Sequence, residues 1–374
     1  MKKMTTKPCE AVYDAWLASA GMPPDLVRRL LDVYKTPEAA FRAFQQGEEP
    51  FRIAVSPRYA SALRVSGAGR WMESTHALIE KHRISVIRYG DPEYPVSLKY
   101  IDQAPAILFF QGNLSCLSGR MLGMVGSRAA SYTGQKAARK LAHDLSSLGV
   151  SIVSGLACGI DAASHQGCIE GGSPTAAVTA CGLDTVYPRD NIRLRNEILE
   201  KNGVILTEYA PGEKPAGWHF PFRNRIIAGF GQALVLVEAR IRSGSMTSVQ
   251  HALDQGKDVF VWPGDPESEH FEGNHQLLRE GGIYFTSADD ILADLHWLDN
   301  QTEVRQNSDC CTEIKADTPE KAAVIRSLSP GSLGFEQLLE KTQLDPPALM
   351  STLTILQISG IVESLPGKQY RLKH

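Results

Sequence analysis

The stretch MVGSRAASYTGQKAARKLAHDLSSLG, residues 124–149, carries the pattern that decides the fold. An apolar run ends in the turn GSR at 126–128, and apolar residues at helical spacing follow from Thr133 to Leu148. Gly149 ends this period, as glycine often ends a helix. The stretch therefore predicts a strand, a glycine turn and a helix, which is the place where α/β proteins hold phosphate groups.

Strand-like and helix-like segments alternate around this stretch, from residue 120 to about residue 297. The further strand-like runs are VSIVSG, TAAVTACG, VILTEY, ALVLVEA, DVFVWPG and IYFTSA. Parallel strands have such continuous apolar sequences when helices cover both faces of their sheet. We therefore predict an α/β fold with a doubly wound, mostly parallel sheet.

The rest of the chain indicates smaller modules on either side of this sheet. Residues 1–80 contain short helical patterns that begin near prolines, so we expect a small helical module. The central domain is placed at 81–297, and the runs ISVIRY and AILFFQG near its start indicate strands. Residues 298–317 have little apolar content and predict a linker. Residues 318–374 predict three helices and a hairpin, the order of a winged helix.

Composition and charge indicate an ordinary globular protein. The chain has 374 residues, of which 43% are hydrophobic and 22% charged, and its formal net charge is -3. A nucleic-acid partner would therefore have to meet a local basic groove. The 7 cysteines have irregular spacing and no CxxC pair, unlike a disulfide framework or a zinc site. We expect a reduced, cytoplasmic protein without a metal, because no signal peptide or membrane span is evident.

Several predicted strand–helix junctions share one composition. Glycine lets the backbone approach a ligand closely, hydroxyl and amide groups donate hydrogen bonds, and arginine adds positive charge. One such turn is ordinary capping chemistry, but a set of them at the carboxyl ends of parallel strands predicts an anion site. The junctions are 126–128 (GSR), 154–161 (SGLACGID), 181–191 (CGLDTVYPRDN), 222–225 (FRNR), 242–248 (RSGSMTS) and 263–274 (PGDPESEHFEGN).

The first junction matches neither common cofactor motif. A dinucleotide fingerprint needs GxGxxG and an acid about twenty residues further on. Here Gly123 and Gly126 have the wrong spacing, Arg128 intrudes, and Asp144 falls inside the predicted helix. A Walker A pattern is also missing from the sequence. We therefore expect no nucleotide cofactor.

The junctions contain acids and histidines but no committed catalytic set. Neither a nucleophile elbow nor spaced metal ligands occur. Glu238 follows an apolar strand, and the favoured interpretation pairs it with an arginine of the rim. His165 is expected to pack or cap within its helix. We expect a binding protein rather than an enzyme.

A basic rim without catalytic groups suits an extended polyanion. Arginines from different loops could follow a phosphate backbone over several nucleotides, and flat side chains could stack on bases. A single strand is favoured over a duplex, because loops around a cleft offer no protruding helix for the major groove. The candidates are Arg128, Arg193, Arg223, Arg225 and Arg242 for phosphates and Tyr187, Trp218, His219 and Phe222 for bases.

Six motifs in the central domain occur together: MVGSR at 124–128, SGLACGIDAASH at 154–165, CGLDTVYP at 181–188, FRNRIIAG at 222–229, VEARIRSGSMTS at 237–248 and GNHQLLREGG at 273–282. They resemble the motifs of the DprA/Smf family of DNA-processing proteins. The resemblance implies an extended Rossmann-like domain that binds single-stranded DNA and forms homodimers. It also implies that the protein protects incoming strands and loads the recombinase RecA on them during natural transformation.

The resemblance also implies which residues contact phosphate. The helix after YP often carries a lysine in this family, whereas this chain has NIRLR, so the role falls to Arg193 or Arg195. Ser154 and Gly155 are added from the second junction. The implied residues are Gly126, Ser127, Arg128, Asn191, Arg193, Asn224, Arg225, Ser243, Gly244 and Ser245.

The flanking modules and two other functions stay open. The N-terminal helices resemble a SAM-like or helix-hairpin-helix module without its glycine-rich hairpin. The expected recognition helix of the winged helix, residues 346–360, has no Lys or Arg, which predicts a protein-contact or autoregulatory module. One alternative is a phosphoribohydrolase-like enzyme on a related fold, for which Glu238 and the PGD at 263–265 are a poor match. The other is a transcription regulator that acts through the winged helix.

Overall fold

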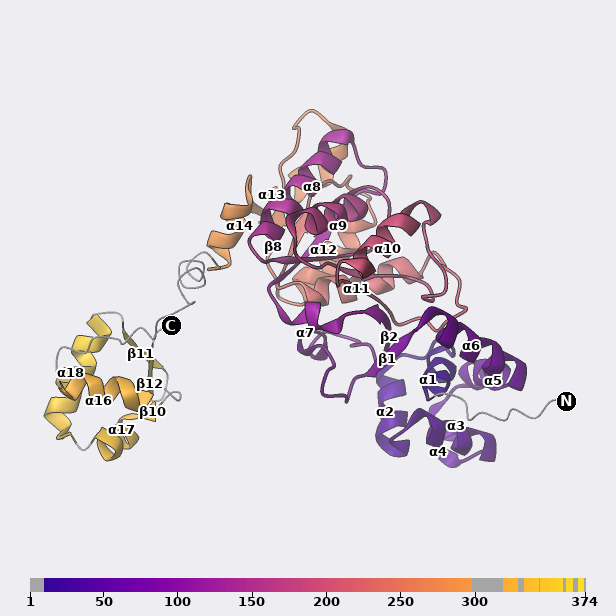
Figure 1. The fold of residues 1–374 in the computed structure, drawn as a ribbon, viewed down its shortest axis with the longest axis horizontal. Helices are drawn as coiled ribbons and strands as arrows, with labels where there is room; N and C mark the ends of the chain where they lie inside the picture. Colours follow the sequence, from indigo (N-terminus) through magenta and orange to yellow (C-terminus); the bar gives the residue numbers. More distant parts are fainter. Residues whose placement is uncertain are drawn as a thin grey trace. The chain divides into compact units, whose positions relative to one another are not determined.

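The computed structural model describes residues 10–297, 319–328, 333–342, 344–358, 361–365 and 369–372. The chain divides into two compact units, Met1–Leu298 and Asp299–His374. The first unit holds the N-terminal helices and a large sheet, and the second holds the C-terminal helices and a small sheet (Figure 1).

A 9-stranded sheet forms the centre of the first unit, in the order β1-β2-β6-β5-β4-β3-β7-β8-β9. Strands β3 to β9 pair in parallel, whereas β1 and β2 are antiparallel to their neighbours. The predicted doubly wound, mostly parallel sheet is confirmed. The strands are β1 (Ser85–Arg88), β2 (Ile107–Gly112), β3 (Met121–Val125), β4 (Ser151–Ser154), β5 (Ala176–Val178), β6 (Val204–Thr207), β7 (Ala233–Leu236), β8 (Val259–Val261) and β9 (Ile283–Tyr284).

The chain reverses its direction through the sheet at β3. From β3 it runs outward through β4, β5 and β6, and it then crosses to β7 on the other side of β3. Val125 at the end of β3 pairs with Leu236 at the end of β7, so the two carboxyl ends lie side by side. Open α/β sheets form their ligand crevice at such a point, because the two following loops diverge.

Helices cover both faces of this sheet. Leu122 and Met124 of β3 share a buried cluster with residues of α8 and α14, whereas Met121 and Val125 face α11 and α12. This alternation is the period-2 pattern of a strand that is buried on both sides. The helices are α7 (Val96–Lys99), α8 (Tyr132–Ser147), α9 (Ile160–Gly171), α10 (Ile192–Glu200), α11 (His219–Phe230), α12 (Ser245–Asp254), α13 (Glu272–Arg279) and α14 (Ala288–Asp294), with 3-10 turns at Leu114–Ser118, Arg189–Asn191 and Glu269–Phe271.

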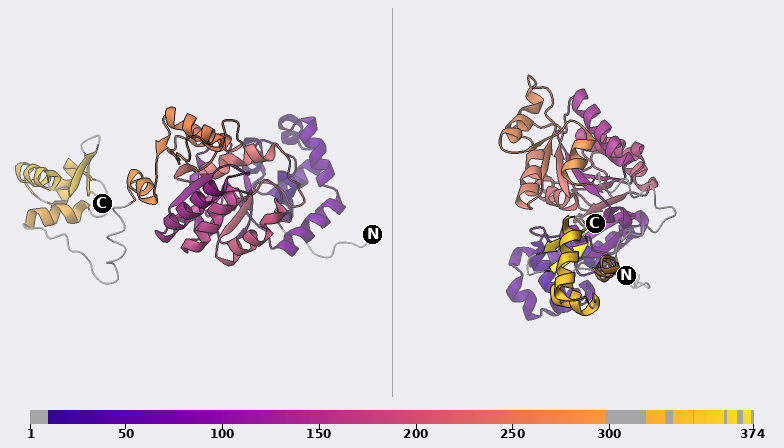
Figure 2. Two further views of the ribbon diagram at one scale, coloured as in Figure 1. Left: turned by 90° about the horizontal axis from the view of Figure 1, so that it is seen from above. Right: turned by 90° about the vertical axis from the view of Figure 1, so that its left-hand side faces the viewer.

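Short helices precede the sheet and lie beside its β1–β2 edge (Figures 1 and 2). The indole of Trp16 is fully buried among them and donates to the carbonyl of Leu63 at 2.9 Å. Asp14, which is also buried, accepts two hydrogen bonds from Arg88 of β1 at 2.7 and 2.8 Å. This ion pair joins the helices to the sheet. They are α1 (Ala11–Ala18), α2 (Pro24–Tyr34), α3 (Pro37–Gln46), α4 (Glu49–Ala54), α5 (Pro57–Ser66) and α6 (Gly69–His82).

Lys257 closes the carboxyl end of α11. Its ammonium group donates to the carbonyls of Ala228, Gly229 and Gly231 at 2.6 to 2.7 Å. Methionine keeps the apolar stem but leaves these carbonyls without the donor, so Lys257→Met is expected to lower the free energy of unfolding by about 1–3 kcal/mol. Urea unfolding measures the change, and Lys136→Met on the exposed face of α8 is the matched control. An unchanged midpoint would mean that water replaces the ammonium group at no cost.

The second unit has the element order of a winged helix. Three helices are followed by the hairpin of β11 and β12, and β10 adds a third antiparallel strand. Val324, Leu338, Leu353 and Val362 belong to its buried core. The predicted three helices and hairpin are confirmed. The elements are α16 (Pro319–Leu328), β10 (Leu333–Gly334), α17 (Phe335–Thr342), α18 (Pro346–Ile358), β11 (Val362–Leu365) and β12 (Gln369–Leu372).

Candidate functional site

A cavity of about 640 Å³ opens beyond the carboxyl end of β3, where the chain reverses its direction through the sheet. Its walls come from the loop after β3, the first turns of α11 and the segment that leads into α12. We call it the phosphate cavity, because most of its lining belongs to the predicted anion-binding junctions. Of the residues predicted to bind DNA, it gathers Gly126, Ser127, Arg128, Asn224, Ser243, Gly244 and Ser245.

The loop after β3 is fixed by its backbone. The amide of Ser127 donates to the carbonyl of Glu238 at 2.7 Å, and the carbonyl of Ser127 accepts from the amide of Ile160 at 3.2 Å. Gly126 has to be a glycine here, because a Cβ atom would lie 2.9 Å from the Glu238 carbonyl oxygen. The close packing of β3, β7 and α9 therefore holds this loop at the mouth of the cavity.

Arg128 follows this anchored loop and is exposed. Its guanidinium carbon lies 4.4 Å from the centre of the Phe220 ring, which is a cation–π contact. The Phe220 ring in turn lies 5.5 Å from the ring of Tyr187. All three side chains line the phosphate cavity and a smaller adjoining cavity of about 120 Å³. Phe220 is absent from the predicted stacking residues, although the aromatic run WHFPF at 218–222 contains it.

The segment Ser243–Ser245 forms the entrance to α12. Gly244 precedes the helix and offers no side-chain cap, and the hydroxyl oxygens of Ser243 and Ser245 lie 2.7 Å apart. Asn224 of α11 donates to the hydroxyl of Thr247 at 2.8 Å and so fixes the first turn of α12. A helix N-terminus carries partial positive charge and unpaired amides, so this segment favours an anion.

Arg223 is a buried cation in the wall of the phosphate cavity. Its side chain donates to the carbonyl of Val178, and within the described part of the chain its Nε has no hydrogen-bond partner. Burial lowers the pKa of Arg223 to about 10, against the opposing effect of Asp161. Burial also raises the pKa of Asp161, and the charge of Arg223 offsets part of that rise. A side chain at Gly155 would clash with the guanidinium group. The wall therefore holds a second positive charge behind Arg128.

Three other predicted residues lie outside the lining of the phosphate cavity. Ser154 is fully buried, and its hydroxyl donates to a carbonyl of β3 at 2.6 Å. Gly155 lines the smaller adjoining cavity. Asn191 is largely buried, and its amide donates to a carbonyl of the β4–α9 loop at 2.9 Å. The side chains of Ser154 and Asn191 thus hold the loops behind the site.

The remaining predicted arginines differ in how free they are. Arg193 is exposed in the first turn of α10, whereas the guanidinium of Arg195 donates to Gln111. Exposure therefore favours Arg193 over Arg195 as the side chain that can reach a phosphate. Arg225 is 4% exposed and forms two hydrogen bonds of 2.7 Å with the carboxylate of Glu208. Its phosphate contact stays a prediction, which would require this ion pair to open.

The favoured pairing of Glu238 with a rim arginine is wrong. Its carboxylate is fully buried and accepts from the amide of Ser131 at 3.0 Å and from the Ser131 hydroxyl at 2.5 Å. The Nδ1 of His270 lies 3.2 Å away on the other side. A Cβ atom at Gly134 would overlap this carboxylate. Glu238 therefore satisfies the amide of Ser131, the residue that precedes α8 and has no acceptor within the helix.

The predicted stacking residues fall into two groups. Trp218 and Tyr187 are 64% and 45% exposed, so their rings are accessible, and of the two only Tyr187 lines the phosphate cavity. His219 is 2% exposed, and the centre of its ring lies 3.9 Å from the centre of the buried Tyr209 ring, on which it stacks. The guanidinium carbon of Arg225 lies 3.8 Å from the centre of the Phe222 ring. The last two are mainly packing residues.

The described residues offer no metal centre. Among them, no group of three or more His, Cys, Asp or Glu side chains could hold a metal ion, and no helix is long and apolar enough to cross a bilayer. The Nδ1 of His165 lies 2.7 Å from the hydroxyl of Thr175. Burial lowers the pKa of His165 to about 3, so this histidine is a neutral packing residue, as predicted. The cysteines at 116, 158, 168 and 181 are free thiols.

Two protein families match the chain. The family described as DNA recombination-mediator protein A matches residues 85–296, which contain the whole large sheet and the phosphate cavity. The DprA winged helix domain matches residues 312–368.

Individual relatives match most of the chain. Protein Smf from Escherichia coli K12 is 32% identical over 306 residues, which are 81% of this chain and 81% of that protein. DNA processing protein DprA from Streptococcus pneumoniae R6 is 42% identical over 226 residues, 60% of this chain and 79% of that protein.

Two solved structures share the fold. The X-ray structure of DNA processing protein A from Streptococcus pneumoniae has a TM-score of 0.62 at 33% identity and covers 76% of this chain and 97% of its own. A structure of DNA processing protein A from Helicobacter pylori, solved for its unique single-stranded DNA binding mode, has a TM-score of 0.52 at 25% identity. It covers 57% of this chain and 96% of its own.

Proposed function

The chain belongs to the DprA/Smf family of DNA-processing proteins, and we propose that it binds single-stranded DNA through the phosphate cavity. One observation carries the proposal: an anchored glycine loop, two arginines and the N-terminus of α12 surround one open cavity. Each of these groups favours an anion. Together they suit consecutive phosphates of one strand.

The residues have distinct roles in this proposal. Gly126 and Ser127 let the backbone come close to a phosphate, and Arg128 forms a charged hydrogen bond with it. The segment Ser243–Ser245 receives a second phosphate at the N-terminus of α12. Phe220 and Tyr187 provide rings for a base between the two phosphates.

A single strand fits this surface better than a duplex. The cavity is built from loops and first turns of helices, and none of them protrudes as a reading helix for a major groove. The relative from Helicobacter pylori was solved for its single-stranded DNA binding mode, which supports the same choice of ligand.

Beyond binding, we propose a role in natural transformation. As the family resemblance implies, the protein would protect incoming strands in the cytoplasm and load RecA on them as a homodimer. The winged helix would contact protein, because α18 carries no Lys or Arg for the DNA backbone.

We also propose that the protein acts without catalysing a reaction. Glu238, the carboxylate that a phosphoribohydrolase mechanism would need, is committed to Ser131 at the start of α8. A panel of nucleoside monophosphates tests this proposal. Turnover that is lost in Glu238→Gln would overturn it.

The salt dependence of binding tests the proposed ligand. Each phosphate contact with a single strand contributes a slope of about −0.7 to a plot of log affinity against log salt. Contacts by Arg128 and Arg193 therefore predict a slope of about −1.4 for an oligo-dT, because the start of α12 adds no basic side chain to the count. Fluorescence anisotropy at salt concentrations between roughly 50 and 200 mM measures this slope. A duplex of equal length is the control. Equal or tighter duplex binding would contradict the proposal.

A further inference from the structure

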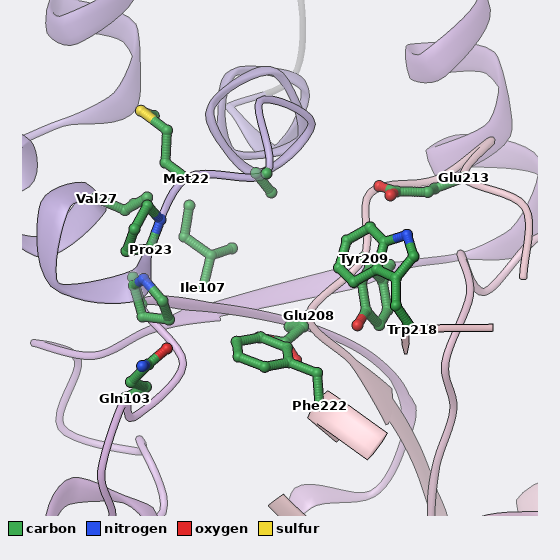
Figure 3. Close-up of a pocket in the computed structure, with 14 residues that line it drawn as sticks. Met22, Pro23, Val27, Gln103, Ile107, Glu208, Tyr209, Glu213, Trp218 and Phe222 are labelled. Atoms are coloured by element: carbon green, nitrogen blue, oxygen red, sulfur yellow. The ribbon is translucent and has the colours of Figure 1, made fainter. Parts of the chain in front are cut away.

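A second cavity, of about 290 Å³, lies between the α1–α2 loop and the segment that leads into α11. Figure 3 shows the rings of Tyr209, Trp218 and Phe222 on one side of it and the apolar side chains of Met22 and Val27 on the other. We call it the aromatic cavity. It shares no lining residue with the phosphate cavity.

The charged side chains that line the aromatic cavity are both acids. Glu208 has its counter-charge in Arg225 at 2.7 Å. Glu213 makes one ion-pair contact within the described residues, with the Nε2 of His219 at 3.4 Å. Burial lowers the pKa of His219, so this ring is neutral near pH 7 and leaves the carboxylate without a cation. Burial and the charge of Glu208 raise the pKa of Glu213 to about 7.

We propose that the aromatic cavity binds a lysine or arginine side chain that a protein partner presents. Met22, Val27 and Ile107 match the apolar stem of such a side chain. Trp218 is 64% exposed, whereas tryptophan side chains are buried over most of their surface on average. Its ring can therefore bind a cation on its face. Glu213 supplies the opposite charge. A nucleic acid strand is disfavoured here, because the carboxylate repels phosphate.

The position of this cavity links it to the phosphate cavity. Trp218 and Phe222 line the aromatic cavity, whereas Phe220 and Pro221, from the same first turn of α11, line the phosphate cavity. A partner that inserts a basic side chain would therefore sit beside the phosphate cavity. The inference goes beyond the proposed DNA binding and does not depend on it.

The test uses the full-length protein and a short peptide. The probe is acetyl-Ala-Ala-Lys-Ala-Ala-amide, and the same peptide with norleucine in place of lysine is the uncharged control. The protein is labelled with 5-fluorotryptophan, and Trp218→Phe assigns its signal among the 5 tryptophans. We expect the lysine peptide to shift the Trp218 signal with millimolar affinity and the norleucine peptide to leave it unchanged.

Two further measurements sharpen this test. Glu213→Gln is expected to weaken the lysine peptide about fivefold, whereas Glu200→Gln on the exposed face of α10 has no effect. Binding should be tighter at pH 8 than at pH 6, because Glu213 ionises near pH 7 beside neutral His219 and the paired Glu208.

The outcomes separate this inference from the proposed function. Equal binding of the lysine and norleucine peptides, or full binding by a folded Glu213→Gln variant, would overturn the basic side-chain site. A shift of the Trp218 signal by thymidine monophosphate in place of the peptide would also overturn it. Oligo-dT affinity is expected to be unchanged in Glu213→Gln, so a failure of DNA binding would be seen separately.

Discussion

Arg128→Ala is expected to lower the affinity for an oligo-dT strand about tenfold, and Arg128→Glu about a hundredfold. The guanidinium group is exposed on a loop that backbone hydrogen bonds hold in place, and its contact in the structure is the face of the Phe220 ring. It is therefore free to pair with a phosphate. The slope of log affinity against log salt should become smaller by about 0.7. Fluorescence anisotropy at several salt concentrations measures both changes.

A matched control separates this contact from a general change of charge. Arg70 is exposed on α6 and does not line the phosphate cavity. Arg70→Ala therefore removes the same charge outside the proposed binding site. We expect Arg70→Ala to bind like the unchanged protein, and both variants to unfold at the same temperature. Wild-type affinity in Arg128→Ala, together with a loss in Arg193→Ala, would place the strand over α10 and not in the phosphate cavity.

The layered fold was predictable because periodicity reports burial. The continuous apolar runs of β3 to β8 need cover on both faces, and this requirement predicts a parallel sheet between helices. The helix predicted from Thr133 to Leu148 is observed at Tyr132–Ser147. Periodicity gives no strand order, however. The runs ISVIRY and AILFFQG predict strands, but their antiparallel addition beside β6 depends on pairing between segments far apart in the chain.

The candidate site was predictable in place but not in detail. Glycine, serine and arginine after parallel strands indicate an anion site, because the topology brings these turns to one edge. The same composition does not say which arginine is free. Arg128 and Arg225 both follow small polar residues, yet Arg225 meets Glu208 from the end of β6 and is buried. Glu238 likewise meets Ser131, 107 residues away, which no local pattern indicates.

This difference makes Arg225→Met the strongest test of stability in the first unit. The variant leaves the carboxylate of Glu208, whose side chain is 11% exposed, without its two hydrogen bonds. Removal of one partner of a buried ion pair typically costs about 3–5 kcal/mol, so we expect a loss of that size in the free energy of unfolding. Urea unfolding measures it. Arg193→Met, which replaces an exposed arginine, should leave the unfolding midpoint unchanged.

A double variant shows whether the loss comes from the buried charge. Glu208→Gln combined with Arg225→Met removes both charges, and it should recover part of the stability, because a neutral pair costs less to bury than one unpaired carboxylate. The same proteins decide the role of Arg225 in DNA binding. If the folded Arg225→Met variant binds oligo-dT normally, the ion pair is structural. If it is stable but binds about tenfold more weakly, the ion pair opens and Arg225 contacts phosphate as the sequence predicts.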